Sequence, residues 1–136
     1  MLFISACVPL QPQNTPYKKE NTDRLNILVQ LNDLNERAFA YHHYCLKKDE
    51  PINETFLDNL ETTSNLLFDE CKTVLKWKPE YIVSQVVKRR EKIQEQLRSH
   101  YRSKGCRSSE AMAAYNHYQS FSRLGEADIE ALTTPR

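Results

Sequence analysis

The chain has 136 residues, enough for one domain with a modest core. Its 19 Lys and Arg residues nearly balance 18 Asp and Glu residues, so bulk charge gives no support to a nucleic-acid-binding protein. The sequence contains only two glycines, which disfavours turn-rich β-sandwiches and Rossmann-like folds and favours long helices. No apolar run reaches the ~18 residues of a membrane-spanning helix.

The N-terminal segment changes character at a cysteine. Residues 4–7 read Ile-Ser-Ala-Cys, which resembles a bacterial lipobox, where a small residue precedes a cysteine that becomes lipid-modified. The following stretch, VPLQPQNTPYKKENTD, has three prolines and no apolar periodicity, as a tether would. We therefore expect residues 1–6 to be the remnant of a lipoprotein signal, Cys7 to carry the lipid, and residues 7–21 to be a flexible tether. The alternative is a frayed terminus without lipid.

The residue after the expected lipidation site indicates a location. Val8 replaces the aspartate that is associated with retention in the inner membrane. By that resemblance, the protein is expected at the outer membrane, facing the periplasm. One lipid chain alone would hold it only weakly.

The first two helices follow from apolar residues spaced three and four apart. A helix from Thr22, its expected cap, to about Lys47 has the stripe Ile27, Leu31, Leu34, Ala38, Tyr41 and Cys45. The second begins after the cap Asn53 and should stop by Trp77, because Lys78-Pro79 disfavours helical geometry at Lys78. Its stripe is Phe56, Leu60, Thr63, Leu67, Cys71 and Val74, with Leu57, Phe68 and Leu75 beside it.

The third and fourth helices have clear ends. Pro79 can open the third and Gly105 can end it; its stripe is Ile82, Val86, Ile93, Leu97 and Tyr101, with Val83 and Val87 on a neighbouring edge. Ser108 can cap the fourth, which has Ala111, Tyr115, Tyr118 and Phe121 on one face and ends at Gly125. Short connections favour antiparallel neighbours, so residues 22–125 are predicted to form an up-down four-helix bundle. Residues 126–136 are a tail with one weak helical turn or none.

This topology selects one disulfide among three possible pairings, if Cys7 carries lipid. The first and third helices run in the same direction and bring Cys45 and Cys106 to one end of the bundle, whereas Cys71 stays apart in the core. A Cys45–Cys106 bond would close a loop of about 60 residues, and a periplasmic location would permit it. The alternative is three buried thiols in a cytosolic protein.

Polar residues give little support to catalysis or metal binding. The chain has no nucleophile elbow, phosphate loop or CxxC pair. His42 and Cys45 alone are too few for a metal site, and we interpret His42 and His43 as surface residues. We therefore expect no enzyme activity, cofactor or metal.

Charges are segregated between the second and third helices. Residues 49–70 carry only acids, whereas residues 86–107 are strongly basic. A nucleic-acid or anionic-lipid surface would explain the basic stretch. We instead expect the two helices to face each other and to offset their charges, and we expect no nucleic-acid partner.

The extra apolar residues beside two stripes suggest a further function. Leu57, Phe68, Val83 and Val87 would either widen the core or line a groove for a partner helix.

Together these features resemble the α-helical pilotins of type II secretion (the PulS/OutS type), over roughly residues 22–124. The segments KGCRSSEAMAAYNHYQSF and LKWKPEYI carry the resemblance, with matching positions at Cys7, Cys45 and Cys106. It implies a small outer-membrane lipoprotein that binds a short C-terminal segment of a secretin subunit as a helix in a groove, without catalysis. The binding energy would come from burying apolar side chains of a disordered peptide, reduced by the cost of ordering that peptide.

Two other functions remain open. The chain could be a permanent structural lipoprotein of a secretion-system outer-membrane core complex, including type IV systems, which needs broad apolar patches. It could also be a cytosolic helical regulator that uses the basic third helix on nucleic acid, which needs free thiols.

Overall fold

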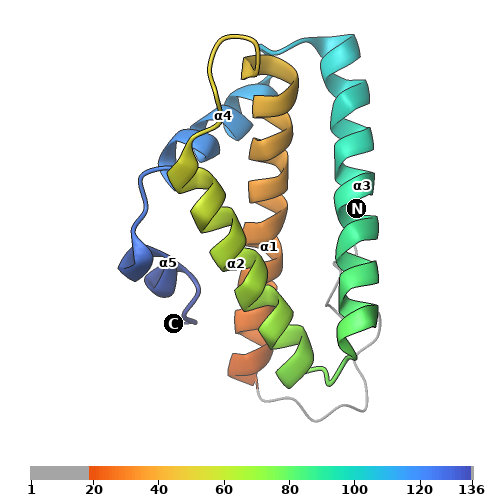
Figure 1. The fold of residues 1–136 in the computed structure, drawn as a ribbon, viewed down its shortest axis with the longest axis vertical. Coiled ribbons are helices and arrows are strands. Elements are labelled where there is room, and N and C mark those ends of the chain that lie inside the picture. The colour runs from red at the N-terminus through yellow and green to blue at the C-terminus, as the bar shows by residue number, and fades with distance from the viewer. Residues whose placement is uncertain (1–18, 136) are drawn as a thin grey trace.

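The computed structural model describes residues 19–135, with side chains from Asp23 onward, and this part of the chain is all-α (Figure 1). Helices α1 to α4 alternate in direction, so the predicted up-down bundle is confirmed. The elements in order are α1 (Lys19–Tyr41), the π-helical segment η1 (His42–Leu46), α2 (Glu54–Thr73), α3 (Pro79–Lys104), α4 (Ser109–Phe121) and α5 (Glu126–Leu132). None of these helices is long and apolar enough to cross a bilayer.

Local capping rules explain most helix ends. The Asn53 side chain accepts a hydrogen bond from the Phe56 N–H at 2.9 Å and caps α2. Ser108 Oγ accepts one from the Ala111 N–H at 3.1 Å and caps α4. Pro79 is the first residue of α3, and Gly105 follows its last residue with φ of 76°. These four predicted boundary residues are confirmed.

The end of the first predicted helix differs from the expectation. The α-helix stops at Tyr41 and continues as η1, where the wider π turn changes which side chains face inward. His42 is consequently buried, and its Nε2 lies 3.0 Å from the Glu50 carbonyl oxygen. The prediction of a surface imidazole is wrong for His42, whereas His43 is exposed.

Both ends of the described chain contain more helix than predicted. α1 begins at Lys19, three residues before Thr22, so the expected tether is helical from that point. α4 ends at Phe121 and not at Gly125, and the tail forms α5 with Ile129 and Thr133 buried. A hollow lined by the start of α1 and by α5 shows that the two lie side by side.

The core has three apolar clusters, and α1 contributes to all of them because it packs against α2, α3 and α4. One lies where α2 turns into α3: Leu25, Leu28, Val29, Leu67, Cys71 and Ile82. The second joins α1, α3 and α4: Ala40, Tyr41, Ile93, Leu97, Tyr101, Ala111 and Ala114. The third joins α1, α2 and α4: Leu31, Ala38, Phe56, Leu60, Tyr118 and Phe121.

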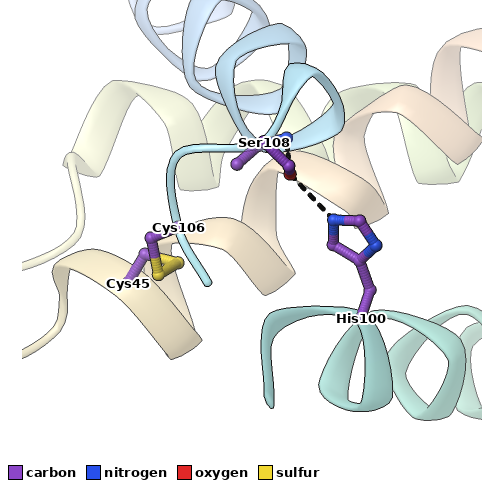
Figure 2. Close-up of a disulfide and its surroundings, with 5 residues drawn as sticks. Cys45, His100, Cys106 and Ser108 are labelled. Carbon is purple, nitrogen blue, oxygen red and sulfur yellow. Dashed lines mark hydrogen bonds between the residues drawn. A yellow bond between two sulfur atoms is a disulfide. The ribbon is translucent and has the colours of Figure 1, made fainter. Parts of the chain in front are cut away.

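A disulfide links Cys45 in η1 to Cys106 in the α3–α4 turn, with a Cα–Cα distance of 5.9 Å (Figure 2). The predicted pairing is confirmed. Cys71 is fully buried in the first cluster, apart from this bond, and it is also disulfide-bonded. The expected lipidation site Cys7 and residues 7–18 of the expected tether lie outside the described residues.

Candidate docking cleft between α2 and α3

A cleft opens between α2 and α3, with α1 behind it. The two helices meet at their connecting turn and diverge toward the other end of the bundle (Figure 1). The empty volume is about 440 Å³, open solvent at its mouth included. Four apolar side chains line it, namely Val29, Leu67, Val86 and Ile93, together with the polar residues Asn32, Asp33, Glu36, Ser64, Arg89 and Arg90.

None of the four predicted groove residues is among the side chains that line this cleft, but each is three, four or seven residues along its helix from one that does. On α2, Ser64 lines the cleft, and Leu57 and Phe68 are seven residues before it and four after it. On α3, Arg90 lines the cleft, and Val83 and Val87 are seven and three residues before it. We call these four residues the rims.

The rims differ in how available they are to a partner. Val83 and Val87 are 52% and 45% exposed, and Leu57 is 37% exposed. Phe68 is half-buried and packs against the first core cluster. The α3 rim therefore offers more free apolar surface than the α2 rim, and the predicted groove stays a prediction.

Two ion pairs connect α1 to α3 at the cleft. Arg89 binds the Asp33 carboxylate with two nitrogens, and its Nε lies 2.7 Å from Asp33 Oδ1. Arg90 Nε lies 2.9 Å from Glu36 Oε2. Burial raises the pKa of Glu36, and the neighbouring Arg90 opposes this effect. The Arg90 side chain is half-exposed at the cleft.

These pairs correct the expectation that α2 and α3 offset each other's charges. Among residues 23–135, the ion pairs of α3 reach α1, α4 or α3 itself, and the α2 acid Glu70 pairs with Arg24 of α1. The reason is geometric: α2 and α3 diverge where their acids and bases lie, and α1 supplies its own carboxylates between them.

A buried polar layer crosses the bundle behind the cleft. Asn35, which is fully buried, donates through Nδ2 to Thr63 Oγ1 at 2.9 Å and accepts from His117 Nε2 at 2.7 Å. Thr63 in turn donates to the Asn59 carbonyl at 3.1 Å. Burial lowers the pKa of His117. The layer thus joins α1, α2 and α4, and the sequence interpretation missed it except for the position of Thr63 in an apolar stripe.

A serine–histidine pair lies where α3 meets α4. His100 Nε2 lies 2.8 Å from Ser108 Oγ and 3.3 Å from Glu110 Oε2 (Figure 2). Ser108 Oγ also caps α4, so the group fastens the end of α3 to the start of α4.

In the described part of the chain, no three His, Cys, Asp or Glu side chains are arranged to hold a metal ion. The fold and the cleft define a disulfide-linked α-helical bundle with a partly apolar groove between two of its helices. Comparison of the chain with models of protein families, with curated proteins and with solved structures gives no match.

Proposed function

We propose that this chain is an outer-membrane lipoprotein that binds a C-terminal segment of a secretin-type channel subunit and anchors that subunit to the membrane. The α2–α3 cleft carries the proposal, because it is a partly apolar depression between two helices. Such grooves bind amphipathic helices through side chains spaced three and four residues apart. The family resemblance supplies the identity of the partner.

The chemistry of the cleft describes its occupant. The apolar lining residues Leu67, Val86 and Ile93 favour aliphatic or aromatic side chains on the inward face of the bound helix. The half-exposed side chain of Arg90 favours a carboxylate at the cleft. A peptide that is disordered when free would lose part of the binding energy to ordering, so the complex should be of moderate affinity.

The Cys45–Cys106 disulfide supports a location outside the cytosol, where such bonds persist. It counts against the cytosolic nucleic-acid regulator, which needs free thiols. A permanent structural subunit would instead bury broad apolar patches, typically more than about 2,000 Å² in total.

The α3 rim gives a direct test of the cleft. The full chain carrying Val83→Asp and Val87→Asp should fold normally, because both side chains are exposed. It should bind a synthetic secretin C-terminal peptide at least about tenfold more weakly in calorimetry, because two buried valine contacts are lost. Met112→Asp, on the 40% exposed Met112 of α4, is the matched control and should bind like the wild type. Equal binding by the rim variant and the wild type would remove the cleft from the mechanism.

The anchor needs a separate test. Mass spectrometry of the natively expressed protein should show a diacylglyceryl group on Cys7. A cysteine sulfur that carries a lipid cannot also form a disulfide, so a lipid on Cys7 would exclude a disulfide at Cys7. An unlipidated Cys7 in the native protein would therefore refute the membrane anchor while leaving the cleft to be judged by peptide binding.

A further inference from the structure

The turn between α2 and α3 presents three lysines and an aromatic pair on one end of the molecule. Lys72 ends the last turn of α2, and Lys76 and Lys78 follow in the turn; all three are exposed. None of the ion pairs described between residues 23 and 135 uses them. The rings of Trp77 and Tyr81 meet edge to face with centroids 4.8 Å apart. We call these five residues the basic turn.

The aromatic pair has one half-buried and one exposed member. Trp77 packs against the first core cluster, whereas Tyr81 is 49% exposed. Trp77 therefore fixes Tyr81 beside the lysines with part of its ring in solvent. Tyrosine and tryptophan next to lysine form the combination that is enriched where proteins meet lipid headgroups.

Lys76 has an unusual backbone conformation. Its φ is 60°, and the next residue closes the turn with a hydrogen bond from the Trp77 N–H to the Cys71 carbonyl at 3.3 Å. Glycine or asparagine normally takes this left-handed position, because a Cβ makes it unfavourable. The chain therefore places a lysine where a glycine would be less strained, and such sites are enriched in function.

The basic turn lies at the end of the bundle where the described chain begins. Leu25 and Leu28 near the start of α1 pack in the same cluster as Leu75 and Trp77 (Figure 1). A lipid on Cys7 would thus hold this end, and not the disulfide end, close to the membrane.

We propose that the basic turn docks on an anionic phospholipid surface and orients the bundle upright on the membrane. The inference rests on the proposed lipid anchor for its role in the cell, although the contact itself needs only the turn. Each lysine near an anionic bilayer strengthens binding about fivefold, which is about 1 kcal/mol. Glu80 and the exposed Asp69, three residues before Lys72, weaken the local positive charge and leave the three lysines a net excess of one positive charge. Contact this weak becomes effective once a lipid keeps the turn near the surface.

The orientation has a consequence for the cleft. α3 has 26 residues and is therefore about 39 Å long. With the basic turn on the membrane, α3 would stand away from the surface, and Arg90 would lie part of the way along it at the cleft mouth. A partner helix could enter the cleft from the side without displacing lipid.

The test measures binding of the unlipidated full chain to sedimented vesicles of phosphatidylcholine, with and without phosphatidylglycerol. The wild type should bind the anionic vesicles more strongly, and added salt should weaken that binding. The variant with Lys72, Lys76 and Lys78 changed to Ala should lose it. The matched control changes Lys47, Lys48 and Lys104, three exposed lysines at the disulfide end, to Ala and should bind like the wild type.

Lys76→Gly separates docking from folding. It relieves the left-handed strain, so its thermal midpoint should not fall, yet its binding to anionic vesicles should weaken about fivefold. The proposal would be overturned if the disulfide-end control lost as much vesicle binding as the variant with Lys72, Lys76 and Lys78 changed to Ala. It would also be overturned if that variant bound like the wild type, or if the wild type bound neutral and anionic vesicles equally. Because no lipidated protein is used, these outcomes do not depend on Cys7 or on peptide binding to the cleft.

Discussion

Removal of the Cys45–Cys106 disulfide tests how the bundle is stabilised. The two cysteines are separated by 61 residues, and the bond restricts every unfolded conformation of the loop between them. For a loop of that length the restriction is worth about 4 kcal/mol at 25 °C. A single domain has about 5–15 kcal/mol in total. The variant with Cys45→Ala and Cys106→Ala should therefore remain folded at 25 °C but lose a large share of its stability.

Urea denaturation followed by circular dichroism measures this loss. The oxidised wild type is compared with the double variant, and reductant is left out because Cys71 is also disulfide-bonded. The slope of the transition should rise, since the unlinked unfolded chain exposes more surface. Cys45→Ala alone is the control and should lose as much as the double variant, because either change breaks the same bond. A loss below about 1 kcal/mol would contradict the loop-entropy argument.

Other expectations concern the polar layer and the helix caps. Asn35→Ala should lower the free energy of unfolding by about 2–3 kcal/mol, because Thr63 and His117 lose a buried partner. Thr63→Val should lower it by about 1–2 kcal/mol. Urea denaturation measures both losses. Since burial holds the pKa of His117 below 6.5, the unfolded chain takes up a proton first, and stability should fall as the pH drops below that value. His117→Gln should make the thermal midpoint depend less on pH over this range. Glu36 has a raised pKa, so its protonation at more acidic pH should favour the folded chain and oppose the effect of His117. Asn53→Ala should lower the thermal midpoint, at a cost of about 1 kcal/mol, because α2 loses its cap; an unchanged midpoint would show that water replaces the cap.

The features predicted correctly from the sequence follow local rules. α3 has the expected bounds because Pro79 lacks an N–H that an inner helical turn would need, and Gly105 takes a positive φ. The disulfide pairing followed from helix directions, with Cys7 set aside as the expected lipidation site. Val83 and Val87 lie off the apolar stripe, and the structure leaves both about half-exposed and outside the lining of the cleft.

The features that were missed depend on residues far apart in the chain. Asn35 and His117 are separated by 82 residues, and neither polar residue signals the other. The π turn at His42 inserts a residue that no 3.6-residue periodicity reveals. The depth of the cleft depends on the divergence of α2 from α3, which α1 permits by pairing its own carboxylates with the α3 arginines.

The buried Asn35–Thr63–His117 layer also sets the lengthwise alignment of three helices. A slip of one helix by a single turn, about 5.4 Å, would keep much of the apolar contact. The same slip would leave an amide, a hydroxyl and an imidazole buried without partners, each at about 1–3 kcal/mol. Apolar surfaces alone tolerate several registers, so these hydrogen bonds select one. That selection keeps the start of α1 level with the α2–α3 turn.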